Sequence, residues 1–503
     1  MHQQIAFAEI ERWRKQLDRL ALDIWENPEG PYREYHACEW TAQLLRDAGF
    51  DVEVGVGGIK TAIRATCGSG KPVFGLLGEY DALPGMSQKV CTHKESVVDG
   101  GWGHACGHNL LGVAHAGAAI GLKKAMEEGK LPGTVIYFGC PAEEVLTGKA
   151  LMARAHVFDG IDFCAAFHPN PMNQVLLGTA TGLNSFKLHF KGRTAHAGCD
   201  PHNGRSALDA VELTNVGINY LREHVPTSVR IHYVITEGGV APNIVPDKAC
   251  AWYFVRALTR EVIDDVYGRV LDIARGAALM TGTTLEVEFL GGCYPTLNNQ
   301  VLGQVMYDSL CETPHDLWTQ EELNFAAALN GDKKLDEPIH TGVVQSRDNC
   351  YGSTDVGDVQ HIAPGIAFDG ACWNMGAPGH HWQVTACVGH SIGLKGMIYA
   401  AKAMALFGLK VMSDPELLAQ AKKSSMKKRR ASPMSAPSPM RFPSPIRIEP
   451  HRKCSAFTYR NIYRQTAVLH RISISPAQTG GRFSKYSKSV PLLLYCSGRA
   501  SLP

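Results

Sequence analysis

The chain has 503 residues, of which 45% are hydrophobic, and a formal net charge of +2. This length leaves room for two or three domains with buried cores. No apolar run of about 18 residues occurs, and residues 1–10 lack the cationic start and apolar stretch of a signal peptide, so we expect neither a membrane protein nor a secreted one. The 15 cysteines are scattered through strand-like segments, which favours a reducing cytoplasm.

The first informative element is an apolar run from Val73 that predicts a buried strand, followed by an acidic turn at Asp81. A carboxylate there is a candidate for orienting a metal-bound histidine, because such imidazoles usually donate their other N–H group to a carboxylate. The alternative is an Asx turn ahead of Pro84.

Residues 103–109 supply a thiol at Cys106 and an imidazole at His108, between glycines. Glycines let the backbone bend around an ion, and a thiolate beside an imidazole suits zinc or a similar divalent metal better than calcium or magnesium. A single cysteine–histidine motif of this kind more often arises by chance or belongs to the hydrophobic core than forms a metal site. Further ligands must therefore come from elsewhere in the chain.

Residues 135–140 predict a short buried strand that leads directly into Glu143 and Glu144. Open α/β sheets place their chemistry at such carboxyl ends. Neighbouring side chains point in different directions there, so one carboxylate can bind a metal while the other acts as a general base. The alternative is a solvated acidic turn.

Two further segments offer histidines near the ends of predicted elements. The strand-like run 161–167 ends at His168, and the Gly/Pro-rich loop 376–382 contains His380 and His381 ahead of an apolar, helix-like segment that begins near Thr385. Each histidine alone is more often structural than a ligand. Together with the thiol and the carboxylates they form a set typical of a metal site, which either His380 or His381 could complete.

The middle of the chain alternates between strand and helix patterns. The order strand, helix, strand, strand, helix, strand is typical of a ferredoxin-like fold, and it falls on residues 185–190, 206–224, 229–235, 249–255, 261–280 and 284–289. Because this unit separates the two halves of the candidate site, we predict a discontinuous catalytic α/β domain with an inserted lid. The expected boundaries are 1–183 and 293–421 for the catalytic domain, and 184–292 for the lid.

Two lid residues are candidates for contacting a substrate. His196 follows the first lid strand between small residues, which argues for access from outside rather than for the usual buried core histidine. Arg256 alone is more often a surface or structural charge, yet a guanidinium is well suited to bind a carboxylate with two hydrogen bonds.

As a set, these motifs make the chain resemble the M20 family of metallopeptidases and amidohydrolases, and within it the p-aminobenzoyl-glutamate hydrolase B-subunit type. The likeness extends over roughly residues 8–421. Five motifs carry it, in the family's order and approximate spacing: Asp81-Ala82-Leu83-Pro84, His104-Ala105-Cys106-Gly107-His108, Pro141-Ala142-Glu143-Glu144, Phe167-His168-Pro169 and Pro378-Gly379-His380.

The resemblance implies an α/β fold in which a dinuclear-metal catalytic domain, with a mixed sheet flanked by helices, carries a ferredoxin-like α+β lid or dimerisation domain. It implies two divalent ions, zinc or manganese, with Cys106 as the bridge between them. It also implies that Glu143 is the general base and that Asp81 orients a ligand histidine. The implied metal ligands are Cys106, His108, Glu144, His168 and His380; His381 occupies a position where serine is common, and His380 is chosen for its distance from Pro378.

For the lid, the resemblance implies that His196 polarises the scissile carbonyl, often from the partner subunit of a dimer. Asn243 and Arg256 match residues that hold the terminal carboxylate of the substrate in glutamate-releasing members. We therefore expect a homodimer, formed through the lid, that hydrolyses an N-acyl amino acid or a dipeptide, with p-aminobenzoyl-glutamate as the first expectation.

The C-terminal segment differs in character from the rest. Residues 422–503 contain 17 Lys and Arg against one acid, Glu449, and include several Ser-Pro steps, so we expect a basic, disordered tail. Such clusters can bind nucleic acid or direct a protein to the nucleus, but a divergent or mispredicted terminal exon is at least as good an explanation, and we expect no nucleic-acid partner. The competing hypothesis for the whole chain is a non-catalytic binding or assembly protein that uses this tail.

Overall fold

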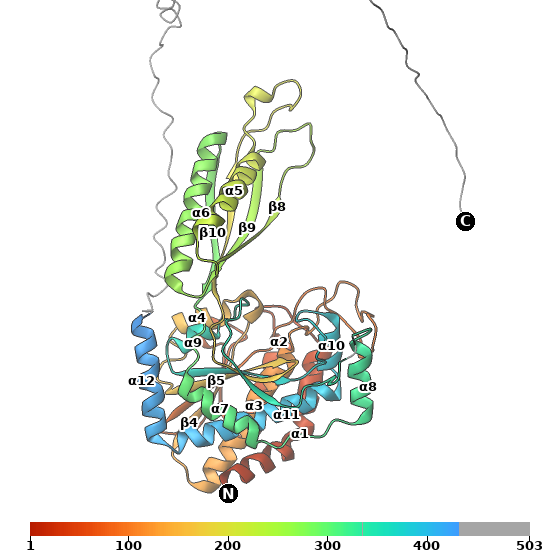
Figure 1. Ribbon diagram of the computed structural model, residues 1–503, viewed down its shortest axis with the longest axis vertical. Helices are drawn as coiled ribbons and strands as arrows, with labels where there is room; N and C mark the ends of the chain where they lie inside the picture. Colours follow the sequence, from red (N-terminus) through yellow and green to blue (C-terminus); the bar gives the residue numbers. More distant parts are fainter. Residues whose placement is uncertain (334, 432–503) are drawn as a thin grey trace, which may run out of the picture. The chain divides into compact units, whose positions relative to one another are not determined.

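Two sheets organise the part of the chain that the computed structural model describes, which is residues 1–333 and 335–431 (Figure 1). The strands are β1 Asp51–Val54, β2 Ile63–Ser69, β3 Val73–Gly78, β4 Gly133–Gly139, β5 Phe163–Asn170, β6 Asn173–Leu176, β7 Gly182–Lys191, β8 Arg230–Glu237, β9 Lys248–Ala257, β10 Thr284–Cys293, β11 Val343–Ser346 and β12 Gly365–Ala371. The α-helices are α1 His2–Glu26, α2 Tyr35–Asp47, α3 His108–Gly129, α4 Gly148–Arg154, α5 Ala207–Leu221, α6 Arg260–Thr281, α7 Gln300–Glu312, α8 Gln320–Leu329, α9 Val356–Gln360, α10 Trp382–Val388, α11 Ser391–Met412 and α12 Pro415–Ala431.

The larger sheet is mixed, with the strand order β1-β2-β4-β3-β5-β12-β6-β11. Its centre is parallel, because β4, β3, β5 and β12 pair in the same direction, whereas β2 and β6 pair antiparallel with their neighbours β4 and β12. Phe74 and Leu76 of β3 join the hydrophobic cluster that contains α1, α3 and α11, while Leu77 joins the cluster that contains α4 and α9. Burial on both faces explains why these strands are continuous apolar runs in the sequence, and the predicted mixed α/β fold is confirmed.

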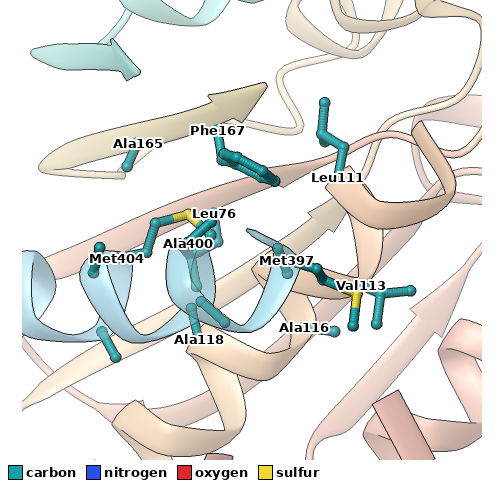
Figure 2. Packing of buried hydrophobic residues seen from close by; sticks show 14 of the residues in the cluster. Leu76, Leu111, Val113, Ala116, Ala118, Ala165, Phe167, Met397, Ala400 and Met404 are labelled. Carbon is teal, nitrogen blue, oxygen red and sulfur yellow. The ribbon is translucent and has the colours of Figure 1, made fainter. Parts of the chain in front are cut away.

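The core of this domain lies between the sheet and two long helices (Figure 2). Met397, Ala400 and Met404 of α11 pack toward α3 and toward Phe167 of β5. Among the described residues, α11 is the one helix long and apolar enough to cross a membrane by length and composition, but 89% of its apolar window is buried inside the protein. Its apolar character is accounted for by the core of this domain.

The smaller sheet has the strand order β10-β7-β9-β8, and all its neighbouring strands are antiparallel. In chain order this unit is β7-α5-β8-β9-α6-β10, which confirms the predicted ferredoxin-like fold. Both helices begin at a capping hydroxyl, since Ser206 accepts from the backbone of Asp209 and Thr259 from that of Val262. The helices pack together and cover a core centred on Phe186.

The expectation of disorder from residue 422 onward is wrong for residues 422–431, which continue α12. The basic side chains find partners on the catalytic domain instead of repelling one another: Lys422 Nζ lies 2.6 Å from Asp162 Oδ1, and Lys428 donates to the carbonyl oxygen of Asn298 at 2.8 Å. Residues 432–503, which hold most of the predicted tail, lie outside the described residues.

Candidate active site

Three parallel strands of the larger sheet end side by side and position most of the candidate residues. Asp81 lies just beyond β3, Glu143 and Glu144 follow β4, and His168 lies near the end of β5. The carboxyl ends of parallel strands meet at one edge of a sheet, which is where open α/β sheets place their ligands. The strand pattern thus brings together residues that are nearly 90 positions apart.

The turn before α3 delivers Cys106 and His108 to the same edge. Gly107 lies between them with a φ of 81°, in the left-handed region that glycine adopts without strain. A Cβ atom at this position would also lie 2.9 Å from the Cβ of Pro169. Both the backbone conformation and the tight approach to the end of β5 therefore require glycine between the two candidate ligands.

The candidate ligand atoms converge in two overlapping groups that share Cys106. One group is completed by His108 and His168, the other by Glu144 and His380, and within each group the ligand atoms all lie within 4.8 Å of one another. Cys106 Sγ is 3.3 Å from His168 Nε2, and His380 Nε2 is 3.7 Å from Glu144 Oε2. The arrangement places one sulfur atom between two sets of nitrogen and oxygen donors.

Two buried atoms at the centre of these groups have no hydrogen-bond partner among the described residues: His108 Nε2 and Glu144 Oε1. A buried polar atom without a partner is costly, so an unpaired nitrogen and an unpaired carboxylate oxygen directed into one donor set fit a divalent cation. His381 belongs to neither group within the described chain, and it lies instead at the N-terminal end of α10. Of the two adjacent histidines, His380 is therefore the one that lies with the other donors.

Asp81 contacts both sides of this donor set. Its Oδ1 lies 3.0 Å from His108 Nδ1, and its Oδ2 accepts a hydrogen bond of 2.9 Å from the backbone N–H of Glu144. When Nδ1 of His108 carries the proton and donates it to Asp81, Nε2 keeps its lone pair for a metal. The carboxylate therefore fixes the ring of one candidate ligand and the backbone of another.

The segment that carries the two adjacent glutamates has an unusual backbone. Ala142 and Leu146 have φ values of 59° and 57°, a region that non-glycine residues seldom adopt, and they flank a single 3-10 turn, Glu143–Val145. The backbone N–H of Ala142 donates to the buried carboxylate of Glu34 at 2.9 Å, which helps to hold this conformation. Strain of this kind clusters at functional sites because it aims side chains that regular structure could not.

Glu143 and Glu144 approach different nitrogens of the His108 ring. Glu143 Oε2 lies 3.9 Å from Nε2 and Glu144 Oε1 lies 3.9 Å from Nδ1, and only Glu144 also lies beside His380, at 3.7 Å. Burial, reinforced by the negative charges of Glu79 and Asp355, raises the pKa of Glu143 well above its ordinary value. A buried glutamate beside the donor groups is a candidate to accept a proton and to release it again.

A buried ionic cluster beside these residues was not predicted. Lys149 Nζ lies 2.5 Å from Glu79 Oε1 and 2.6 Å from Asp355 Oδ1, and all three side chains are fully or almost fully buried. Burial opposes the charge of the lysine, but the two carboxylates outweigh it and raise its pKa. One signal was available in the sequence: Glu79 stands two residues before Asp81 in the same acidic turn.

In two loops of the lid, outside the strands of the smaller sheet, His196 and Asn243 lie together. The backbone N–H of Ala197 donates to the carbonyl oxygen of Asn243 at 3.0 Å, and His196 forms a β-bridge with Ile244. His196 Nδ1 accepts from the backbone N–H of Cys199 at 3.0 Å, which leaves Nε2 available. Within the described chain, His196 belongs to neither of the donor groups that contain Cys106.

The structure does not bring Arg256 to Asn243 within one chain. Asn243 precedes Lys248, the first residue of β9, whereas Arg256 lies eight residues farther along the same strand. At about 3.4 Å per residue, Lys248 and Arg256 lie about 27 Å apart. Arg256 instead donates to Ser353 Oγ at 3.1 Å, and its buried Nε has no hydrogen-bond partner among the described residues. The length of β9 therefore separates Arg256 from the loop that carries Asn243.

The chain has recognisable relatives. The family model described as the peptidase dimerisation domain matches residues 179–279. The B-subunit of the p-aminobenzoyl-glutamate hydrolase of Escherichia coli is 40% identical over 441 residues, which cover 81% of this chain and 92% of that protein. The mouse Xaa-Arg dipeptidase is 29% identical over 81% of this chain and 88% of its own length.

Solved structures share the fold. A Klebsiella pneumoniae aminobenzoyl-glutamate utilization protein aligns with a TM-score of 0.55 and 18% identity, covering 80% of this chain and 97% of its own. A Bacillus subtilis protein described as a dinuclear metal binding peptidase from the M20 family aligns with a TM-score of 0.55 and 20% identity, covering 80% of this chain and 99% of its own. Together with the extent of the sequence identity, the fold and the donor set lead to one conclusion. The chain belongs to the M20 family of metallopeptidases and amidohydrolases.

Proposed function

We propose that this protein is a metal-dependent hydrolase that releases an amino acid from an N-acyl amino acid or a dipeptide, with p-aminobenzoyl-glutamate as the first substrate to test. The observation that carries the proposal is the pair of donor groups sharing Cys106, with Glu143 directly beside them. The name of the Escherichia coli relative supports the choice of substrate, and the Xaa-Arg dipeptidase supports the wider dipeptide class. A non-catalytic role of the fold has no comparable support.

The residues that would hold the metals follow from the two groups. His108 and His168 would bind one divalent ion and Glu144 and His380 the other, with Cys106 between them. Zinc and manganese both suit such a mixture of thiolate, imidazole and carboxylate. A dinuclear centre of this kind lowers the pKa of a water molecule and polarises a carbonyl group.

Glu143 would move the proton in this reaction. Its Oε2 would take the proton from the attacking water and then donate it to the nitrogen of the leaving amino acid. Its buried position beside His108 Nε2 fits this role. Asp81 would keep the ring of His108 in the tautomer that leaves Nε2 free of a proton.

The lid residues suggest that the working unit is a dimer. His196 of one chain would donate to the carbonyl oxygen of a substrate bound by its partner, and Asn243 would accompany it, while Arg256 binds the terminal carboxylate. The length of β9 supports this division between chains, because it separates Arg256 from the loop that carries Asn243.

The edge strand β8 is our candidate for the dimer contact. Tyr233, Val234 and Ile235 are 41%, 53% and 40% exposed on this outermost strand. An exposed apolar edge strand tends to pair with another strand, and we propose that it pairs with β8 of a second copy. A cytoplasmic location completes the proposal, since every cysteine that the structure describes is free.

The decisive experiment compares the wild-type protein with Glu143→Gln. We expect the variant to keep the metal content of the wild type by elemental analysis and to lose about 10²- to 10⁴-fold in kcat, because the amide cannot accept the proton. Glu9→Gln, which changes a buried carboxylate on α1, is the matched control and should keep its activity. Wild-type turnover in Glu143→Gln, or a wild-type protein that stays metal-free after incubation with zinc or manganese, would contradict the proposal.

A further inference from the structure

The buried cluster of Lys149, Glu79 and Asp355 has no place in the mechanism described so far. Lys149 Nζ bridges Glu79 Oε1 at 2.5 Å and Asp355 Oδ1 at 2.6 Å, and its backbone N–H also donates to Asp355 Oδ2 at 2.7 Å. The lysine side chain comes from α4, Glu79 follows β3, and Asp355 immediately precedes α9. Three separate elements thus converge on one ammonium group.

Stability alone is a weak reason for such a cluster. Removing three charges from water is costly, and apolar side chains of similar size often serve a protein core equally well or better. The region around Lys149 could have been apolar, since α4 also contributes Met152 to a hydrophobic cluster with Phe138. The buried lysine is therefore better explained by a function of the carboxylates that it contacts.

The free oxygen of Glu79 supplies that reason. Glu79 uses Oε1 for Lys149, and its Oε2 lies 3.4 Å from His108 Nε2, the buried nitrogen that has no hydrogen-bond partner among the described residues. Glu79, His108 and Glu143 form a third group whose ligand atoms all lie within 4.8 Å of one another. The second oxygen of Glu79 is thus directed toward the metal-facing side of the His108 ring, opposite the side that Asp81 contacts.

We propose that Glu79 supplies a further carboxylate oxygen to the ion that His108 Nε2 would bind, on the side of that ring shared with Glu143, and that Lys149 is the positioning residue that holds this carboxylate in place. The inference rests on the proposed metal-dependent function. Because Oε1 is occupied by the ammonium group, Glu79 can offer a single oxygen rather than both. Asp355 in turn fixes Lys149 through its side chain and its backbone.

The test uses the full-length protein with cobalt as a spectroscopic probe. The visible spectrum of bound Co²⁺ depends on the number and kind of its ligands, so it reports on Glu79 directly and does not require turnover. The variants are Glu79→Gln and Lys149→Met, and Co²⁺ affinity is measured by competition with a chromophoric chelator. The control is Lys402→Met, which removes another buried lysine, paired with Glu11 on a different part of the domain.

We expect Glu79→Gln to bind Co²⁺ about 10- to 100-fold more weakly at one of its sites and to shift the cobalt spectrum. Lys149→Met should change affinity and spectrum in the same direction, because its loss releases Glu79, and Lys402→Met should leave both unchanged. Lys149→Met leaves two buried carboxylates unpaired and could fail to fold. Glu79→Gln keeps the pair between Lys149 and Asp355, so it decides the question in that event.

Two negative results have different meanings. A wild-type protein that binds no Co²⁺ would overturn the proposed metal-dependent function itself. A wild-type protein that binds Co²⁺, together with a Glu79→Gln variant of unchanged affinity and spectrum, would overturn only the role assigned to Glu79 and Lys149.

Discussion

The substitution Asp81→Asn tests how the protein prepares its donor set. The carboxylate of Asp81 accepts from two donors at once, with Oδ1 at 3.0 Å from His108 Nδ1 and Oδ2 at 2.9 Å from the backbone nitrogen of Glu144. Asparagine has the same shape but only one acceptor, because its second atom is an NH₂ group. In either orientation of the amide, its NH₂ group faces one of the two donors, the N–H of His108 or the backbone N–H of Glu144.

The size of the effect on metal affinity follows from the loss of this one acceptor. Leaving a buried donor without an acceptor costs about 1–3 kcal/mol, and losing a partner of a metal-bound histidine typically weakens metal binding by about 10- to 100-fold. The two estimates agree, since a tenfold change in affinity corresponds to about 1.4 kcal/mol. Asp81 is almost completely buried, so water cannot readily replace the missing acceptor.

The assay is metal affinity by chelator competition, followed by kcat/KM of the fully loaded enzyme. Asp162→Asn is the matched control, because Asp162 also accepts from a backbone N–H, that of Val73 at 2.8 Å, but lies just before β5, at the other end of the sheet. We expect Asp162→Asn to keep the metal affinity of the wild type. Wild-type affinity in Asp81→Asn, or an equal loss in Asp162→Asn, would refute the reasoning.

Two further predictions concern the pH dependence of stability and the dimer. Burial opposes the charge on Glu322, but hydrogen bonds from Lys395, Ser391 and the backbone outweigh it and lower the pKa of this carboxyl to about 2. Its stabilisation is therefore present above its unfolded-state pKa of about 4.3 and is lost as the pH falls through about 2. Glu322→Gln should lower the free energy of unfolding by up to about 3 kcal/mol at pH 7 and by about half as much at pH 3, as measured by urea unfolding, and a difference independent of pH would contradict this. Mixing inactive Glu143→Gln with inactive His196→Ala should restore about a quarter of the wild-type activity if each site uses both chains of a randomly reassorted dimer. No recovery after verified exchange of chains would place His196 in the same site as the Glu143 of its own chain.

Local spacing in the sequence was sufficient to predict the strands of the catalytic domain and the candidate ligands that follow them. A strand buried on both faces is an apolar run, and its carboxyl end is recognisable because polar residues follow within a few positions, as Glu143 follows Gly139 at the end of β4. The strand and helix pattern of the lid was also predictable from apolar spacing, since the predicted helices 206–224 and 261–280 coincide closely with α5 and α6. The choice between His380 and His381 was not readable in this way, because the two neighbours differ only in where the folded loop directs them.

The sequence by itself determined which residue types stand at the ends of its strands, and hence the fold class and the kind of chemistry. Only the tertiary structure decided which of them meet. It joined Lys149 to Glu79 across 70 positions, placed β9 between Arg256 and the loop that carries Asn243, and continued α12 into a basic segment in which Lys422 pairs with Asp162. Periodicity and motif spacing are set by neighbouring residues, whereas the pairing of buried charges depends on how distant elements pack against one another.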